Sequence, residues 1–463
     1  SGKPLGVREI PAPNIACCGL KISAKAQDWE ALIPDSEENV DSMRSGLRRL
    51  YATFAKAPLL GSLLDPRKHH REDLFQVRYD ALRTALSAAL ALENSKKSSE
   101  LWDLAISAQG LLEAANILDH QYNLVITNVP YLARGKQDPE LQDYCEANYP
   151  IARNDLANVF LERCLELAKP SNAGVTQIVM PQNWLFQSTG ELQRTDLLKR
   201  VSWLLLARLG EGGFDSPQAA GAFIILHTLS NQLPANSHEL HGLEASEPKD
   251  PVGKAGRLRL DATLSIKQSA ILNNPKCIVS FESLHTDLPR LGVYAESYQG
   301  LVTGDISRFT CAFWELPSFG SAWVPLKSPV MDAEDQGRTD ALFWQQGAGD
   351  LHRYAAATRD QLHDMHESGN LAWNRRGVSV NRVRNLRSGY YLGEAFHNSV
   401  AVVVPQKGKE HLLAAIYCFI TSDEFVPEVR KLDSKLSLTN RILLQLPFDA
   451  ERWTAIANQE YPS

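Results

Sequence analysis

The sequence lacks the features that mark secreted, membrane-embedded or zinc-stapled proteins. Its 463 residues include 7 cysteines, irregularly spaced and without a CxxC pair, which argues against a disulfide framework and a structural zinc site. It contains no apolar run long enough to cross a membrane, and its first residues do not resemble a signal or transit peptide. We therefore expect free thiols in a cytoplasmic protein that has no membrane partner.

Motifs for metal-dependent or triad-based hydrolysis are also missing. His69-His70 and the pair His363 and His366 have few carboxylates around them, and no HExxH motif occurs. The order of serine, histidine and aspartate follows no known hydrolase pattern. We therefore expect no metal ion.

The overall charge is slightly acidic. With a formal net charge of −6, 44% hydrophobic and 22% charged residues, the chain has an ordinary globular composition, sufficient for two or three domains. This charge argues weakly against a protein covered in nucleic acid. A local basic segment can still bind phosphates on an acidic chain.

Strand-like and helix-like segments alternate in the first half of the chain. We expect a short buried strand at 14–20, a mainly helical segment at about 28–119, a strand at 123–127, a helix at 154–168, a strand at 175–180, a helix around 192–198 and a strand pair at 201–210 and 220–229. This alternation predicts an α/β domain with a mainly parallel sheet. Ligands of such sheets lie beyond the carboxyl ends of the strands.

The composition changes in the middle of the chain. Residues 231–260 are rich in Pro, Asn, Ser, His and Glu, whereas 261–463 has short strands, tryptophans and clustered arginines. We therefore expect a first domain at 1–235, a linker at 236–260 and a second domain at 261–463.

The segment Asn128-Val129-Pro130-Tyr131 directly follows the strand at 123–127. The exocyclic amine of a nucleobase is a poor nucleophile, and acceptors aimed at its two N–H bonds favour the tetrahedral nitrogen that forms on alkylation. An asparagine oxygen and a backbone carbonyl beside proline are such acceptors, and an aromatic ring can stack on the base. The alternative is structural, because Asn-x-Pro-x is common at strand-to-loop turns and a following tyrosine often packs there.

The tetrad resembles the Asn/Asp-Pro-Pro-Tyr/Phe motif of the amino-group DNA methyltransferases, although Val129 departs from the more usual first proline. NVPYLARGKQ, DLANVFLERCLELA, VMPQNWLF and LGEGGFDSPQAAGAFIIL together resemble the N6-adenine DNA methyltransferases of restriction-modification and phage-exclusion (BREX-type) systems. The resemblance runs from about residue 14 to the C-terminus. It implies a partial Rossmann-like methyltransferase sheet with a helical insertion, followed by a C-terminal α/β target-recognition domain.

The resemblance also implies a reaction and roles for individual residues. Asn128 and the Pro130 carbonyl would hold the amino group of an adenine flipped out of duplex DNA. Tyr131 would stack on that base, and Phe214 and Trp184 would line its pocket. The reaction would transfer a methyl group from S-adenosylmethionine to the N6 atom, in bacterial or archaeal restriction-modification or phage defence.

The family's cofactor-binding motif is missing from the sequence. The family has a glycine-rich turn after its first strand and an acidic residue after its second, and both would precede the segment 14–20, which matches its third strand. We therefore expect a missing N-terminal region or a companion subunit to supply the S-adenosylmethionine site. This part would also cover the sheet edge, since an incomplete sheet exposes apolar strands. The isolated chain would then be inactive.

Two other functions remain open. The missing cofactor motif favours a catalytically incomplete DNA-binding specificity module, whereas Asn128, Pro130 and Tyr131 favour an enzyme, because a pure binding module has no use for them. The same tetrad also serves methyltransferases that act on RNA or on a protein glutamine amide. The arginine-rich second domain favours duplex DNA as the partner.

Five arginines without a carboxylate among them stand in WNRRGVSVNRVRNLRSGYY (373–391): Arg375, Arg376, Arg382, Arg384 and Arg387. Arginines bind phosphates or guanine edges, and the aromatic residues beside them can stack on bases. Arg308 lies in a segment that resembles the opening of the family's target-recognition region and is a further candidate for phosphate contact. The alternative is a solvated charged surface. We expect these residues to contact double-stranded DNA.

Overall fold

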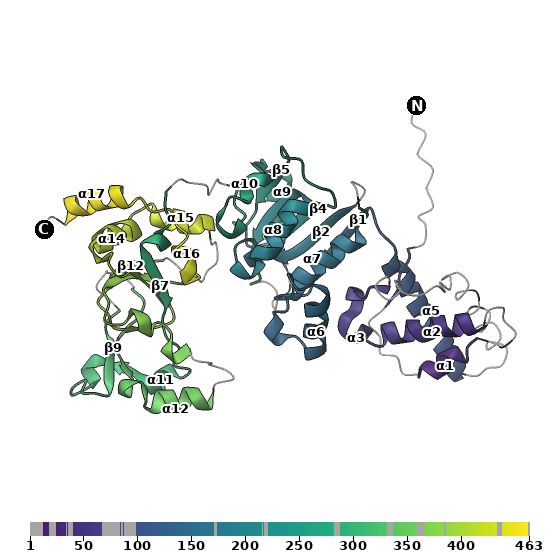
Figure 1. Cartoon of the computed structure of the whole chain (residues 1–463), viewed down its shortest axis with the longest axis horizontal. Coiled ribbons are helices and arrows are strands. Elements are labelled where there is room, and N and C mark those ends of the chain that lie inside the picture. Colours follow the sequence, from purple (N-terminus) through teal and green to yellow (C-terminus); the bar gives the residue numbers. More distant parts are fainter. Residues whose placement is uncertain are drawn as a thin grey trace. The chain divides into compact units, whose positions relative to one another are not determined.

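A computed structural model of the chain (Figure 1) describes residues 13–17, 25–33, 35, 40–66, 84, 87, 99–170, 174–214, 216, 221–281, 288–330, 337–358, 365–383, 386–432 and 438–461. The chain divides into two compact units. The first consists of Ser1–Trp184 with Leu192–Ser269, and the second of Leu185–Glu191 with Ala270–Ser463.

The helices at the start of the first unit share one apolar core with α6 (Pro139–Asn148) and α7 (Leu156–Leu167). Those at the start are α1 (Ala26–Glu30), α2 (Val40–Phe54), α3 (Ala57–Leu60) and α5 (Ser99–Asp119), with the 3-10 helix η1 (Gly61–Leu63). In α2, apolar residues recur at helical spacing, and Leu47, Leu50 and Phe54 are buried. The described part of the segment expected to be helical, about 28–119, therefore consists mainly of helices.

A six-stranded mixed sheet forms the centre of the first unit. Its strands are β1 (Leu124–Asn128), β2 (Val175–Pro181), β3 (Ser202–Gly210), β4 (Ile224–Ser230), β5 (Glu239–Glu244) and β6 (Leu264–Lys267). They lie in the order β1-β2-β4-β3-β5-β6. Strand β1 is parallel to β2 and β3 to β5, while the other three pairings are antiparallel. The α/β class is confirmed, but the sheet is mixed rather than mainly parallel.

Helices connect several of these strands. They are α6 (Pro139–Asn148), α7 (Leu156–Leu167), α8 (Glu191–Arg200) and α9 (Pro251–Leu260), with the 3-10 helices η3 (Arg134–Lys136), η4 (Gln182–Leu185) and η5 (Ser188–Gly190). The side chains of Asp138, Asp155 and Asp250 cap α6, α7 and α9, because each accepts a hydrogen bond from a backbone N–H of the first turn. Helix α7 packs on β2.

A buried ion pair ties the helical segment to α7. The guanidinium of Arg163 lies 2.9 Å from the Asp65 carboxylate and donates to the carbonyl oxygens of Ser62 and Leu64 at 3.1 and 2.7 Å. The side chains of Arg163 and Asp65 are 1% and 4% exposed. Charges are kept in such a dry place only when they are paired and hydrogen-bonded, so this contact fixes the turn after η1 against α7.

Two segments differ from the sequence-based prediction. The described residues of the segment 14–20 form no strand, and Ile15 is 78% exposed, so the prediction of a buried strand is wrong there. The segment 236–260, expected to be a linker, contains β5 and α9 instead, and the two units divide after Ser269. Strand β5 is difficult to predict from the sequence, because polar residues such as the exposed Glu239 alternate with buried ones such as Leu240.

The second unit contains two four-stranded sheets, in the orders β12-β11-β14-β7 and β13-β9-β10-β8. Their strands are β7 (Ala295–Gln299), β8 (Thr310–Ala312), β9 (Trp323–Lys327), β10 (Asp340–Phe343), β11 (Gly377–Asn381), β12 (Ser388–Tyr391), β13 (Ala395–Phe396) and β14 (Val400–Pro405). Strand β14 is buried at every position, which accounts for its unbroken apolar sequence.

Seven α-helices are described in the part of the chain that contains these sheets. They are α10 (Gln268–Ile271), α11 (Ile306–Phe309), α12 (Asp350–Ala357), α14 (Leu413–Thr421), α15 (Phe425–Leu432), α16 (Asn440–Leu443) and α17 (Ala450–Glu460). The 3-10 helices are η6 (Pro275–Cys277), η7 (Leu291–Val293), η8 (Phe313–Glu315), η9 (Gln345–Gly347), η10 (Met365–Glu367), η11 (Asn370–Ala372) and η12 (Glu410–Leu412). Helix α14 packs on β11.

Strand β1 exposes apolar side chains at the edge of the first sheet. Leu124 and Ile126 of β1 are 54% and 68% exposed, and β2 is the only described strand that pairs with β1.

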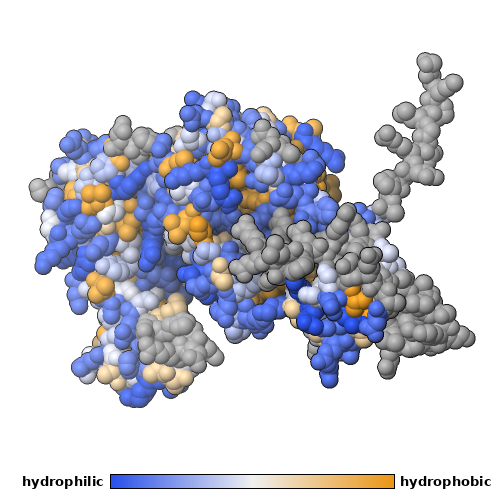
Figure 2. Space-filling view, turned by 45° about the vertical axis from the view of Figure 1, so that its right-hand side comes forward, coloured by the Kyte–Doolittle hydropathy of each residue, from blue (hydrophilic) through white to orange (hydrophobic). Residues whose placement is uncertain are grey.

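The described surface has no single large hydrophobic area on the face drawn in Figure 2, where hydrophobic residues form scattered groups among hydrophilic ones. None of the described helices is long and apolar enough to cross a membrane.

Candidate functional site

The segment Asn128–Tyr131 lies where β1 ends. Asn128 is the last residue of β1 and is paired with Val179 of the parallel strand β2. Its side chain is exposed, and no described group forms a hydrogen bond with its amide. Pro130 is also exposed, whereas Val129 between them is buried. The valine thus anchors the turn, while the asparagine amide stays accessible to a ligand.

Backbone hydrogen bonds fix the loop after this tetrad to the start of α7. The N–H of Leu156 donates to the carbonyl of Leu132 at 3.0 Å, and the N–H of Arg134 donates to the carbonyl of Asn154 at 3.0 Å. Tyr131 is therefore held between the end of β1 and a loop tied to a capped helix. Such support preorganises a binding side chain.

Tyr131 and Phe214 lie against the same apolar cluster. The cluster consists of the buried residues Leu209, Ile224 and Ala245, on which Val179, Ala222, Leu226 and Leu258 also pack. Both aromatic side chains are only partly buried, so each keeps an accessible surface. The Tyr131 hydroxyl oxygen is buried and has no hydrogen-bond partner among the described residues. Burial, assisted by the nearby Asp155 carboxylate, raises the pKa of Tyr131 to about 12, so the phenol is neutral at physiological pH.

Glycines shape the turn that carries Phe214. Gly210 and Gly212 have φ angles of 61° and 74°. A Cβ atom on Gly212 would lie 2.3 Å from the carbonyl oxygen of Lys249, which is closer than a real contact allows. This position therefore requires glycine, and the turn directs the chain from β3 to Phe214.

Trp184 lies in the core of the sheet instead. It is 3% exposed, its indole N–H donates to Oε1 of Gln193 at 3.0 Å, and its ring stacks on Trp203 with centroids 5.6 Å apart. It also contacts His227, the neighbour of Leu226 on β4. Successive strand residues point to opposite faces, so this aromatic group and the Tyr131 cluster lie on opposite faces of the sheet. This placement argues against Trp184 as part of a base pocket.

The described residues do not fit an S-adenosylmethionine site of the expected kind. That site needs a glycine-rich turn after a strand, and in the described part of the chain no strand precedes β1. The glycines near Phe214 serve the turn after β3. Among the described residues, the segment Asn128–Tyr131 therefore has no glycine-rich turn of this kind on an earlier strand.

Two of the predicted DNA-binding arginines are bound within the second unit. Arg375 donates to the Glu296 carboxylate at 2.7 Å. Arg382 donates to the backbone carbonyls of Leu438 and Asn398 at 2.9 and 2.6 Å, and burial lowers its pKa. Their side chains connect segments that are distant in sequence, so a structural role accounts for both.

Three others of the set are exposed: Arg308, Arg376 and Arg387. The guanidinium of Arg308 lies over the rings of Phe309 and Tyr354, 5.0 and 5.4 Å from their centroids, which holds it without neutralising its charge. Arg384 lies outside the described residues.

Of the histidines considered from the sequence, His69, His70 and His363 lie outside the described residues. His366 is buried and lies beside His352, whose Nδ1 is 3.2 Å from Nε2 of His366. No sequence pattern had connected these two residues, because one stands on α12 and the other on η10.

The chain matches known methyltransferases over part of its length. Residues 48–209 match the family model of the Eco57I restriction-modification methylase. The chain is 29% identical over 128 residues to the adenine-specific methyltransferase PglX of Lacticaseibacillus casei (strain Zhang), and 27% identical over 170 residues to the adenine-specific methyltransferase BrxX of Escherichia coli O9:H4 (strain HS). The matches cover 27% and 36% of this chain but span only 10% and 13% of these relatives. The resemblance to adenine-specific methyltransferases is confirmed.

Solved structures of restriction-modification enzymes are also similar, at low identity. The Type IIL enzyme MmeI in complex with DNA is 12% identical with a TM-score of 0.49, and the match covers 92% of this chain and 64% of that one. A nuclease-deletion mutant of the Type ISP enzyme LlaGI, in complex with a DNA substrate mimic, is 9% identical with a TM-score of 0.47, covering 92% and 51%.

Proposed function

We propose that this chain is the base-binding and DNA-recognition part of an adenine-specific DNA methyltransferase of restriction-modification or phage-defence type. The methyl group of S-adenosylmethionine would be transferred to the N6 atom of an adenine flipped out of duplex DNA. The observation that carries the proposal is the accessible Asn128 amide at the end of β1, close in sequence to Tyr131, which shares an apolar cluster with Phe214. The similarity to PglX and BrxX supports the same reaction.

Asn128 and Pro130 would accept hydrogen bonds from the two N–H groups of the adenine amine. As the nitrogen lone pair turns from the ring toward the methyl group, positive charge develops on the nitrogen, and its N–H groups become stronger donors. Acceptors fixed before the reaction stabilise that charge more than they stabilise the ground state. The side-chain oxygen of Asn128 and the backbone carbonyl of Pro130 are suited to this task.

Tyr131 and Phe214 would hold the flipped base by stacking. Flipping costs a few kcal/mol in lost pairing and stacking, and each base–aromatic stack returns roughly 1–3 kcal/mol. The phenol of Tyr131 stays neutral, since its pKa is about 12.

The second unit would hold the duplex through its exposed arginines. Arg308 and Arg376 would contact phosphates, which supply affinity without reading the sequence. Arg375 and Arg382 would instead maintain the fold of this unit, because their guanidinium groups are already bound within it.

S-Adenosylmethionine, when bound, supplies an electrophilic methyl group. We place its binding site on a further segment or a companion subunit that adds a strand to the edge of β1. Leu124 and Ile126 are exposed on that strand, and unpaired apolar edges normally have a cover. The alternative function is a DNA-binding specificity module without catalysis, and the missing cofactor cradle among the described residues favours it.

Two measurements test this function. S-Adenosylmethionine is first titrated calorimetrically into the chain, with and without adenine-containing duplex DNA. Tritium transfer from labelled S-adenosylmethionine to the DNA is then measured with the chain alone and with the protein that includes the cofactor-binding part. We expect transfer by the latter only, into the N6 position of adenine.

Asn128→Ala should lower the rate of transfer by about 10²–10³-fold and leave the DNA affinity unchanged. The loss of one preorganised hydrogen-bonding group has an effect of this size in other enzymes. Asn273→Ala removes an equally exposed asparagine of the second unit and should change neither. If Asn128→Ala transferred the methyl group at the rate of the wild type, the proposed role of this amide would be wrong. Salt-sensitive DNA binding without transfer by either preparation would identify a specificity module.

A further inference from the structure

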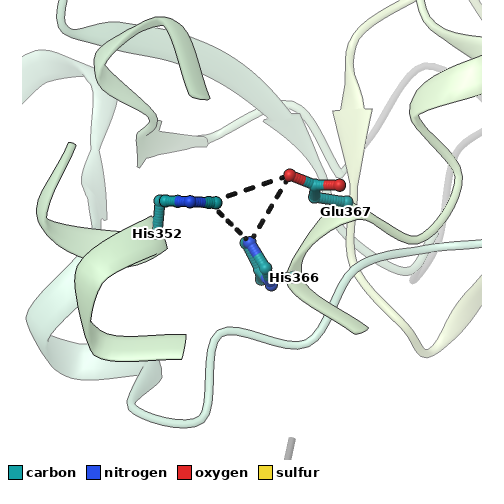
Figure 3. A group of neighbouring side chains, drawn as sticks. All are labelled: His352, His366 and Glu367. Atoms are coloured by element: carbon teal, nitrogen blue, oxygen red, sulfur yellow. Dashed lines mark hydrogen bonds and ion pairs between the residues drawn. The ribbon is translucent and has the colours of Figure 1, made fainter. Parts of the chain in front are cut away.

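Three side chains of the second unit direct their ligand atoms toward one another (Figure 3). Nδ1 of His352 lies 3.2 Å from Nε2 of His366, and Oε1 of Glu367 lies 3.8 Å and 3.6 Å from these two nitrogens. All three atoms lie within 4.8 Å of one another, and no other group of His, Cys, Asp and Glu in the described part of the chain has this geometry.

Hydrogen bonding accounts for only one side of this triangle. The two imidazoles can share a proton at 3.2 Å, but both distances from Glu367 exceed the hydrogen-bond range. Zinc bonds of about 2.0–2.2 Å to nitrogen and oxygen correspond to ligand–ligand distances of about 3.3–3.6 Å in a tetrahedron. The triangle already has this size to within a few tenths of an ångström.

The ligand atoms stand on elements that are held in place. His352 follows Leu351 on α12, and Leu351 is fully buried in the core cluster that includes Leu301 and Phe309. The 3-10 helix η10 is tied to the same region, because the N–H of Val302 donates to the Met365 carbonyl at 2.9 Å. Ligands placed in advance lower the entropic cost of binding an ion.

We propose that His352, His366 and Glu367 bind one Zn²⁺ ion, which joins α12 to η10. Two imidazole nitrogens and one carboxylate oxygen suit zinc, whereas calcium and magnesium prefer sets of oxygen ligands. The His366 side chain is 4% exposed, while those of His352 and Glu367 are 48% and 44% exposed. One side of the site therefore faces solvent, and a water molecule completes the tetrahedron. The proposal departs from the sequence-based expectation of no metal, in which His366 was considered with His363.

Calorimetric titration of Zn²⁺ into the chelator-treated full chain tests the proposal. We expect one ion per chain, and an absorption band of tetrahedral Co²⁺ when cobalt is used instead. His352→Ala and Glu367→Gln should each weaken binding by more than about 100-fold, since even outer-shell partners of a metal are worth roughly 10–100-fold. Both side chains are half exposed, so these variants retain the fold, which circular dichroism checks.

His411→Ala is the matched control. His411 is an exposed histidine of the same unit that lies outside the triangle, and its replacement should leave the affinity unchanged. The absence of binding, or equal binding by the wild type and His352→Ala, would overturn the proposal and leave a hydrogen-bonded cluster. Neither result bears on the methylation assay.

Discussion

Tyr131 and Phe214 pack on one apolar cluster, although they come from loops after two strands that are not neighbours in the sheet. Strand β1 is parallel to β2, and β3 runs in the same direction as β2 because both are antiparallel to β4. The carboxyl ends of β1 and β3 therefore lie at the same end of the sheet. The loops after these strands can meet there, and this is the end at which ligands bind in α/β folds.

The ionisation of Tyr131 predicts a loss of stability at high pH. The phenol has a pKa of about 12 in the folded chain and about 10 when unfolded. Its contribution to the free energy of unfolding is complete below about pH 10 and declines as the pH rises toward 12. Tyr131→Phe removes this decline, so urea unfolding should show the stability of the wild type falling relative to that of the variant between about pH 10 and pH 12. A parallel pH dependence of the two proteins would contradict the buried environment of the hydroxyl.

The neighbouring residues Arg375 and Arg376 should respond differently to replacement by alanine. Arg376 is exposed, so Arg376→Ala should weaken DNA binding and lower the salt dependence, d log K/d log[salt], by about one, with stability unchanged. Arg375 donates to Glu296 and to the Pro405 carbonyl. Arg375→Ala should lower the free energy of unfolding by about 1 kcal/mol, with little effect on the salt dependence.

Fluorescence anisotropy with labelled duplex at several salt concentrations, together with urea unfolding, separates these effects. The two variants remove the same charge from adjacent positions, so each serves as the control for the other. Equal losses of affinity with unchanged stability would show that both arginines contact DNA and that the link from Arg375 to Glu296 is dispensable.

Local patterns were sufficient to predict β1, β2 and the turn Asn128–Tyr131 at the end of β1. The strand and the turn are each determined by a few neighbouring residues, namely the β-branched run and Pro130. The same reasoning placed Trp184 at the end of β2. It could not predict that this ring turns to the face opposite the Tyr131 cluster, because that depends on its contacts with Gln193 and Trp203, which come later in the chain.

Contacts between distant segments were beyond prediction from one sequence. The five clustered arginines formed a single basic segment, yet Arg382 is bound by carbonyls of residues 398 and 438. Strand β5 was missed because its exposed side carries Glu239 and His241, and these polar residues suggested a linker. In both cases the sequence shows the chemical type of the residue, while the partner that decides its role lies far along the chain.

The exposed edge of β1 should make the isolated chain self-associate. Strand β1 has exposed Leu124 and Ile126, and its outer edge has no partner strand among the described residues, so it can pair with a second copy. Ile126→Lys should reduce this association, measured by sedimentation velocity over a range of protein concentrations. Leu260→Lys introduces the same charge at a leucine that is 84% exposed elsewhere in the first unit, and it should have no effect. Equal association of the wild type and Ile126→Lys would show that the edge of β1 is not a pairing surface.

The buried pair of Arg163 and Asp65 should determine how firmly the helical segment is attached. Arg163→Ala takes the cation away from a carboxylate that is 4% exposed, so it should lower the free energy of unfolding by about 3–5 kcal/mol. Arg163→Met combined with Asp65→Leu removes both charges and should recover part of that loss, because the dehydration cost of each charge disappears, while the carbonyls of Ser62 and Leu64 still lose their donor. Arg48→Ala breaks the more exposed pair with Glu30 and should have a much smaller effect, because solvent screens that pair. Urea unfolding compares the variants, and similar small losses for Arg163→Ala and Arg48→Ala would mean that apolar contacts alone attach the helices to α7.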